Sequence, residues 1–99
     1  MERYRTAGID ELRRMVLPLE LRKRLGFEVR KTVVGMRPVN SLVILLAVGE
    51  NDEAERFVRN IDEMGRIVVP GELMEEMGWD IKDKVAVYQA DDRTAILRL

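Results

Sequence analysis

The side chains of this sequence that offer the most chemistry are cations, and they gather in its first half. Arg22, Lys23 and Arg24 form a run without a carboxylate, and Arg13 and Arg14 form a pair upstream of it. Lys and Arg neutralise phosphates and release the counterions of a nucleic acid, and Arg also makes bidentate contacts to guanine. The pattern indicates nucleic-acid contact through one patch, if the turn at Arg13 folds near the helix. A short exposed helix also commonly carries charges for solubility.

The absence of His and Cys excludes most other chemistry. The chain has no imidazole that could act as a base at neutral pH, and it has no thiolate for a metal site or a disulfide. The neighbouring carboxylates Asp10 and Glu11 suit a turn better than acid–base catalysis. No Gly-rich phosphate loop or nucleophile motif is present. We therefore expect a binding protein, not an enzyme, with no cofactor and no metal.

The charges are segregated along the chain, which the formal net charge of -1 conceals. Residues 1–47 carry ten basic and five acidic side chains, for a formal charge of +5. Residues 48–99 carry seven basic and thirteen acidic side chains, for a formal charge of -6. This asymmetry is typical of a nucleic-acid surface, but attraction between the two halves would also explain it.

Length allows one domain or two very small ones, and we expect a cytoplasmic protein. The 99 residues are 46% apolar, which is enough for a hydrophobic core. No apolar run approaches the roughly 20 residues that a membrane span needs. The N-terminal residues lack the apolar stretch of a secretory signal, so we expect no membrane association.

The chain contains an internal repeat with an offset of 52 residues. Residues 9–33 align without a gap on residues 61–85, and the match extends over 42 positions with 12 identities. A fixed offset that also preserves Pro and Gly at turn positions indicates a tandem duplication. A unit of about 45 residues cannot bury a sufficient core alone, so two units must pack together.

The repeat divides the chain into three segments. Residues 1–48 form a basic first unit, residues 49–56 an acidic linker, and residues 57–99 an acidic second unit. Both units are expected to join in one folded body.

Each unit predicts the same elements. An initial strand is followed by a turn and a second strand, then by a short helix between a Pro and a Gly, and finally by two strands joined by a turn. The expected second strands are 14–17 and 66–69, the helices lie between Pro18 and Gly26 and between Pro70 and Gly78, and the closing strands are 32–36, 42–48, 84–89 and 94–99.

This order of elements resembles the SpoVT/AbrB swapped-hairpin family. The resemblance rests on the segments IDEMGRIVVPGELMEEMGWDIKDKVAVYQADDRTAILRL and, less completely, IDELRRMVLPLELRKRLGF. Members include bacterial transition-state regulators and antitoxins of the MazE type. The resemblance implies a mainly β fold with short helices, in which two copies interlock their hairpins into a small β-barrel. Because both copies lie in one chain here, it implies an intrachain pseudo-dimer.

The family resemblance also implies double-stranded DNA as the partner and places the contacts. The expected positions are Arg14 and Arg66 after the turn, the helix positions Arg22 and Lys23, and a first-strand position that is Arg59 in the second unit. The second unit has Met74 and Glu75 at the helix positions, so the first unit is expected to dominate. The complete set of candidate DNA-binding residues is Arg3, Arg5, Arg13, Arg14, Arg22, Lys23, Arg24, Arg59 and Arg66.

Arg13 departs from the resemblance. The second unit has Gly65 at this position, which suits a backbone with positive φ, where a side chain costs on the order of 1 kcal/mol. Either the turn of the first unit has a different conformation, or the additional cation offsets the strain through function.

Two further expectations concern partners. The strand 42–48 is apolar on both faces, and Leu42, Ile44 and Leu46 are expected to form an interface between two chains, a dimer of pseudo-dimers. Cover from within the monomer is the other reading. The alternative function is an antitoxin-like or accessory module, in which the acidic second unit binds a protein.

Overall fold

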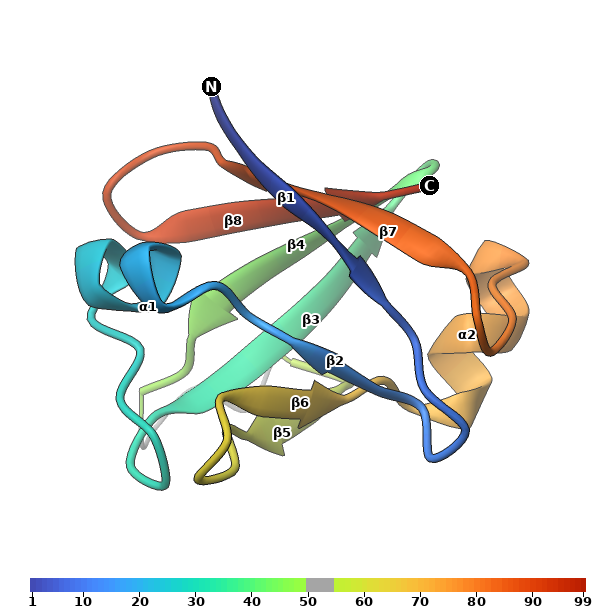
Figure 1. The fold of residues 1–99 in the computed structure, drawn as a ribbon, viewed down its shortest axis with the longest axis horizontal. Coiled ribbons are helices and arrows are strands. Elements are labelled where there is room, and N and C mark those ends of the chain that lie inside the picture. The colour runs from blue at the N-terminus through green and yellow to red at the C-terminus, as the bar shows by residue number, and fades with distance from the viewer. Residues whose placement is uncertain (50–54) are drawn as a thin grey trace.

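The computed structural model describes residues 1–49 and 55–99, and its elements recur in the same order in both units (Figure 1). The first unit contains β1 (Glu2–Gly8), β2 (Arg14–Val16), α1 (Leu19–Leu25), β3 (Val33–Val39) and β4 (Leu42–Ala47). The second unit contains β5 (Val58–Asn60), β6 (Arg66–Val68), α2 (Gly71–Met77), β7 (Lys84–Gln89) and β8 (Thr94–Arg98). Most of the expected linker, residues 50–54, lies outside the described residues.

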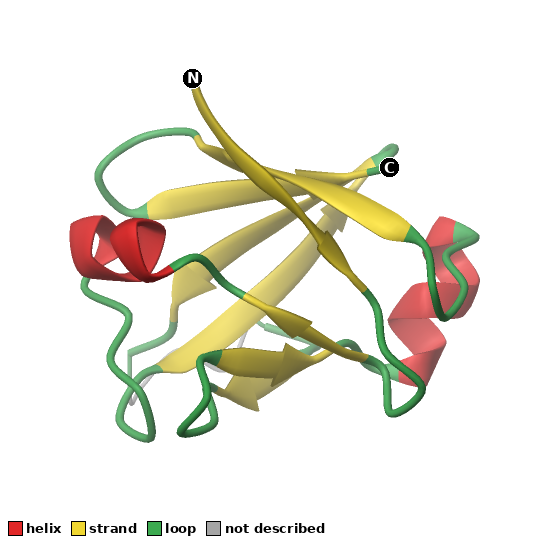
Figure 2. Cartoon of the chain, viewed as in Figure 1, coloured by secondary structure: helices red, strands yellow, loops and turns green. Residues whose placement is uncertain are grey.

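The strands form two antiparallel sheets with a helix at either end of the molecule (Figure 2). The large sheet has the order β1-β7-β8-β4-β3-β5, and the small sheet pairs β2 with β6. The expected mainly β fold with two short helices is confirmed. In one respect the expectation was wrong. The described strands do not close into one barrel, because no hydrogen-bonded ladder links the small sheet to the large one or joins β1 to β5.

The two units exchange their first strands, while the third and fourth strands of each unit pair with each other. The first strand of each unit pairs with the third strand of the other, β1 with β7 and β5 with β3. Exchanging the two units therefore gives the same strand order, read from the opposite edge of the large sheet. Ile44 pairs with its own repeat counterpart Ile96, and Met15 pairs with Ile67, so an approximate twofold axis passes through both sheets.

The helices begin and end at the residues that the repeat preserves. Pro18 and Pro70 occupy the N-caps, and Gly26 and Gly78 occupy the C-caps with φ of 70° and 68°. Only Gly adopts this left-handed conformation without steric cost, and it turns the chain back so that the amide of the next residue bonds to the last turn. The Phe27 amide accordingly donates to the Arg22 carbonyl at 2.9 Å.

One hydrophobic core lies between the sheets and takes residues from both units. Leu21 and Leu45 of the first unit are fully buried in it, as are Leu73 and Leu97 of the second. Apolar burial of this kind is the main driving force for folding, and neither unit supplies this core alone.

No helix in the described part of the chain is long and apolar enough to cross a membrane.

The outer face of β4 is less exposed than its sequence suggested. Leu42, Ile44 and Leu46 are half-buried, while Val43 and Leu45 on the inner face are fully buried. Strands β3 and β8 flank β4 in the sheet, and Ile44 lies opposite Arg37 on one side and Ile96 on the other. The contact between chains therefore remains a prediction.

Substitution of Leu45 by Ala tests the shared core. The free energy of unfolding in urea should fall by about 2–5 kcal/mol, because the change removes a buried side chain and leaves a cavity. Leu12→Ala, at a position that is 63% exposed, is the matched control and should change it by less than about 0.5 kcal/mol. Equal losses in the two variants would contradict this location of the core.

Candidate nucleic-acid interface

Each turn before the small sheet is closed by an aspartate. In the first unit the Asp10 carboxylate accepts hydrogen bonds from the Leu12 and Arg14 amides at 2.9 and 2.8 Å, and from Arg14 Nε at 2.8 Å. The second unit repeats all three bonds between Asp62, Met64 and Arg66. The recurring Asp and Arg four residues apart thus form a structural clamp, which leaves only the outer guanidinium atoms of Arg14 and Arg66 for a ligand.

The clamp also lowers the pKa of both aspartates. The hydrogen bond from the Arg14 amide is the main cause for Asp10 and lowers its pKa, because it stabilises the charged carboxylate. For Asp62, burial is the largest influence and raises the pKa, but the bonds from Arg66 and Met64 together outweigh it. Both groups are therefore carboxylates at neutral pH and neutralise the arginines that they hold.

The last residue of each turn reaches the other unit through its backbone. The Leu17 amide donates to the Gly65 carbonyl at 2.9 Å, and the Val69 amide donates to the Arg13 carbonyl at 2.7 Å. Both turn residues are left-handed, with φ of 63° at Arg13 and 78° at Gly65. The turn has therefore not changed conformation, and Arg13 retains a strained backbone that positions its carbonyl for Val69.

The first junction is the contact between α1 and the turn 62–65. Here the Arg22 side chain crosses directly over Gly65, so a Cβ at Gly65 would lie 2.6 Å from Arg22 Nη2. Arg22 Nε donates to the Leu17 carbonyl at 2.9 Å, which fixes the side chain in this position. Gly65 is buried and has no side chain, which provides the space that the guanidinium occupies.

Two hollows meet at Arg22. One of about 510 Å³ is lined by Arg5 and Arg22 together with residues 16–19. The other, of about 390 Å³, is lined by Arg22, Lys23 and residues 26–29. Within the described residues, Arg5, Arg22 and Lys23 make no ion pair with a carboxylate, so their charges are available to an anion.

The second junction is the corresponding contact between α2 and the turn 10–13. The Arg13 guanidinium lies beside the first residue of α2, with Cζ 3.8 Å from the position of a Cβ on Gly71. Met74, the counterpart of Arg22, is buried in the core. One patch with Arg13 was expected only if its turn folds near α1, and this condition is not met, because the turn of each unit lies against the helix of the other.

The remaining candidate cations are engaged elsewhere. Arg24 forms an ion pair with Glu2, and the Arg3 guanidinium lies 5.8 Å from the centre of the Tyr88 ring, a cation–π contact on the large sheet. Arg59 donates to the Val58 carbonyl at 2.8 Å. None of these three residues belongs to the cluster of Arg5, Arg22 and Lys23.

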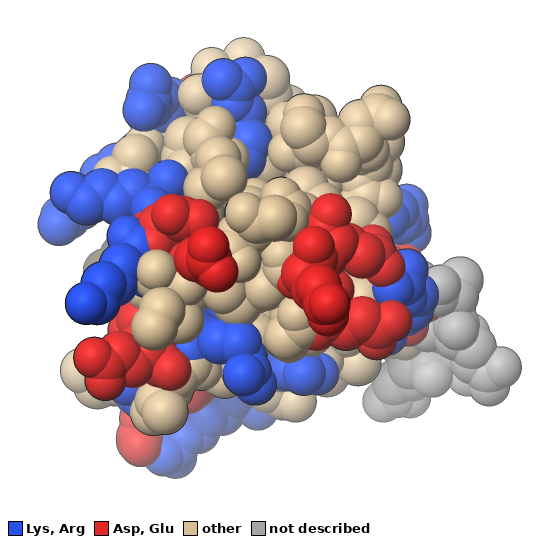
Figure 3. Space-filling view, turned by 90° about the vertical axis from the view of Figure 1, so that its right-hand side faces the viewer, with Lys and Arg blue, Asp and Glu red and all other residues tan. Residues whose placement is uncertain are grey.

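The α2 end of the molecule is acidic. Figure 3 shows acidic side chains gathered on this face, with basic side chains around them. Two of the carboxylates, Glu72 and Glu76, form ion pairs with Arg56, and these contacts raise the pKa of Arg56, with Glu76 as the larger cause. Glu75 is exposed and forms no ion pair among the described residues. The acidity of α2 is thus partly neutralised within the chain.

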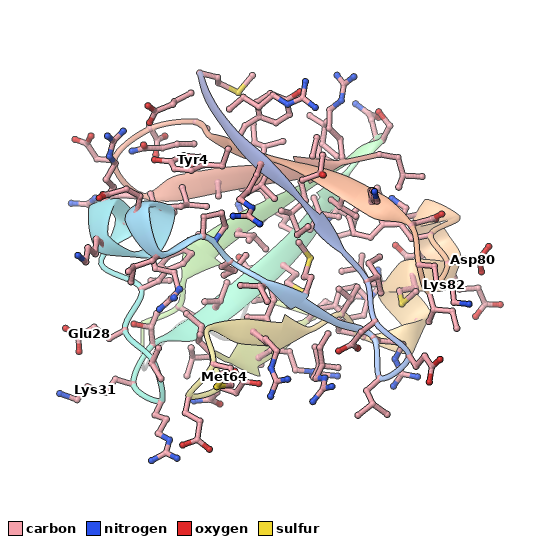
Figure 4. The ribbon with its side chains drawn as sticks, in the orientation of Figure 1. Tyr4, Glu28, Lys31, Met64, Asp80 and Lys82 are labelled. Carbon is pink, nitrogen blue, oxygen red and sulfur yellow. The ribbon has the colours of Figure 1, made fainter. Side chains whose placement is uncertain are left out.

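The outer face of the small sheet lies between the two junctions. Arg14 is opposite Val68 and Arg66 is opposite Val16, so each arginine has a twofold-related partner. The turn tips beside it carry the exposed side chains of Leu12 and Met64, which are 63% and 65% exposed. Met64 projects from the turn next to β6 (Figure 4). The face combines two half-neutralised arginines with apolar side chains.

Sequence reasoning missed two features of this interface. It did not identify Gly65 as the site on which Arg22 rests, and it placed Met74 at a contact position although Met74 is buried. The signal for the second was present, because Leu73 and Met74 are adjacent apolar residues and a helix of two turns can bury both. Within residues 1–49 and 55–99, no group of three carboxylates is arranged to hold a metal ion.

Comparison with known proteins concerns the fold. No protein-family profile and no curated protein sequence matches this chain. Its fold is similar to the solution structure of PHS018 from Pyrococcus horikoshii, with a TM-score of 0.54 and 19% sequence identity over 100% of this chain and 92% of that chain. This likeness extends over the whole chain and shows the fold alone.

Acid titration tests the aspartate clamps. A carboxylate with a lowered pKa in the folded state stabilises the fold above its unfolded pKa of about 3.9, and that contribution is lost as the pH falls through the folded pKa. The free energy of unfolding should therefore decrease on acidification below about pH 4. Asp10→Asn should lower stability at neutral pH and flatten this decrease, as measured by urea denaturation down to about pH 2. An unchanged acid slope in this variant would contradict the assignment.

Substitution of Gly65 by Ala tests the position of Arg22. The left-handed backbone makes the change cost on the order of 1 kcal/mol, and the new Cβ displaces the guanidinium. Gly8→Ala is the matched control, because Gly8 has no positive φ and a Cβ added there would meet no heavy atom within 4 Å. Urea denaturation should show a loss for Gly65→Ala alone, and equal stability of the two variants would contradict the close contact.

Proposed function

We propose that this chain is a cytoplasmic DNA-binding transcriptional regulator of the SpoVT/AbrB type, built as an intrachain pseudo-dimer with swapped hairpins. It contacts double-stranded DNA mainly through its first unit. The exchange of strands between the units supports the swapped-hairpin relationship, since β1 pairs with β7 and β5 with β3.

The observation that carries the proposal is the group of cations at the first junction. Arg5, Arg22 and Lys23 lie around α1 and form no ion pair with a carboxylate of the described residues, in a chain whose net charge is -1. Arg5 and Lys23 are exposed and Arg22 is half-buried. Neighbouring cations without counter-charges attract phosphate, and their attraction is strongest at low salt. Arg14 and Arg66 lie on the outer face of the small sheet, but each is paired with its own aspartate and offers only its outer guanidinium atoms.

The size of the molecule fits a short DNA site. Its longest extent is 29 Å, which is slightly less than one helical turn of B-DNA, about 34 Å. The two junctions lie on either side of the approximate twofold axis, an arrangement that suits contact with both strands of a duplex. One chain therefore spans about one turn.

A second candidate function rests on the acidic α2 end. An antitoxin-like or accessory module would bind a basic protein there, and the exposed Glu75 favours this function. The ion pairs of Arg56 with Glu72 and Glu76 oppose it, because a basic partner would have to displace Arg56. We rank it below DNA binding for that reason.

A homo-oligomer, in which two chains associate through Leu42, Ile44 and Leu46, is part of the proposal. Two chains would present two basic helices. Half-burial of these three residues leaves a limited apolar area, so the association is expected to be weak. Light scattering at high protein concentration tests it, and a strict monomer would remove this part of the proposal.

Anisotropy titration with labelled duplex DNA at several salt concentrations tests DNA binding. Wild-type protein should bind with a steep salt dependence. The double variant Arg22→Glu/Lys23→Glu should lose most of its affinity, and the salt slope should decrease by roughly 2, because two phosphate contacts are removed.

The matched control is Lys82→Glu/Lys84→Glu. It makes the same change in net charge at two exposed residues outside the first junction, and Figure 4 shows Lys82 beside α2. This variant should retain most of the wild-type affinity. Equal losses in both variants would show a general charge effect, and no binding of mixed genomic fragments at low salt would exclude the function.

A further inference from the structure

Each junction contains one arginine, which comes from the helix at the first junction and from the turn at the second. At the first junction the helix supplies Arg22 and the turn supplies Gly65. At the second junction the turn supplies Arg13 and the helix supplies Met74. Repeat position 13/65 is thus Arg in one unit and Gly in the other, and position 22/74 is Arg in one unit and Met in the other. Because strands are exchanged, each junction combines the turn of one unit with the helix of the other, and each receives one guanidinium.

At the first junction the Arg22 guanidinium occupies the space that a side chain at position 65 would need. A Cβ at Gly65 would lie 2.6 Å from Arg22 Nη2, so a side chain there would displace the guanidinium from its present position. At the second junction the helix position holds Met74, which is buried in the core. Arg13 extends from the turn at φ of 63°, and its guanidinium lies beside Gly71 at the start of α2.

The two guanidiniums are held differently as a result. Arg22 is half-buried and fixed by its bond to the Leu17 carbonyl, whereas Arg13 is exposed and forms no ion pair within the described residues. The next helix residue also differs, with the cation Lys23 at the first junction and the anion Glu75 at the second. A phosphate backbone would meet two cations on the first helix and a carboxylate on the second, which disfavours the same path at both junctions.

We propose that the two junctions bind two different halves of a duplex DNA site, so that the chain recognises an asymmetric sequence in a single orientation. This inference rests on the proposed DNA-binding function. Arg13 provides at the second junction the contact that Arg22 provides at the first. A symmetric dimer of identical subunits matches a palindrome, because identical surfaces face identical half-sites. In this chain the backbone has approximate twofold symmetry, but the side chains at the two junctions differ.

Affinity cleavage measures the orientation directly. The chain has no Cys, so Met64→Cys or Leu12→Cys introduces a single thiol at one of two equivalent, exposed turn tips. An iron chelate that cleaves DNA is attached to that thiol. The labelled proteins are then bound to a duplex that wild-type protein selects from a random pool at low salt.

The Met64→Cys label should cut the duplex on one side of the site, and the Leu12→Cys label should cut it on the other side. Equal cutting on both sides by each label would show two orientations and would overturn the inference, while leaving DNA binding itself established. Failure of wild-type protein to select any duplex would overturn the proposed function and this inference together.

Arg13→Gly tests the role of Arg13 separately. Gly relieves the left-handed strain, so the fold should not lose stability, yet DNA affinity should fall on the order of tenfold. Lys82→Gly is the matched control, because Lys82 is also an exposed cation at positive φ, 73°, in the adjoining turn, where its amide donates to the Ile9 carbonyl. It should leave affinity within about twofold of wild type at the same salt. Unchanged affinity in Arg13→Gly, with urea denaturation showing an intact fold, would overturn the assigned role of Arg13.

Discussion

The two backbone hydrogen bonds that cross between the units, from Leu17 to Gly65 and from Val69 to Arg13, determine where the turns lie. Each requires a turn carbonyl that points away from its own unit, and this requires a left-handed residue at the end of the turn. The aspartate clamp sets the rest of the turn, because its carboxylate satisfies two amides that would otherwise lack partners. The turns, the small sheet and the helix starts are consequently positioned together.

The hydrogen bonds between the units also explain why Arg13 has a left-handed backbone, which is unfavourable for a residue with a side chain. A long side chain at φ of 63° is strained, yet Arg13 keeps the conformation of Gly65 because the carbonyl bond to Val69 needs it. Tertiary contacts here outweigh a local backbone preference of about 1 kcal/mol. Arg30 and Lys82 show the same pattern in the turns after the helices, where both are left-handed and donate their amides across to Ile61 and Ile9.

The elements were predictable from the local sequence, whereas the contacts between individual turns and helices were not. Helix α1 begins after Pro18 and ends at Gly26 as expected, because the local sequence determines helix ends. Strand β7 also begins at Lys84, as predicted. Which turn packs against which helix depends on pairing between residues about 52 positions apart, and no local pattern encodes that choice. Arg24 illustrates the effect on the site, because its partner Glu2 lies on a strand 22 residues away.

Covalent linkage of the two units changes how the amount of folded protein depends on its concentration. When two separate chains must interlock, the fraction assembled falls on dilution by mass action, and the assembled form grows faster than linearly with total protein. Here the strands that pair between the two units belong to one chain, so their pairing is intramolecular and does not weaken on dilution. The supply of folded molecules then rises in direct proportion to the amount of chain synthesised.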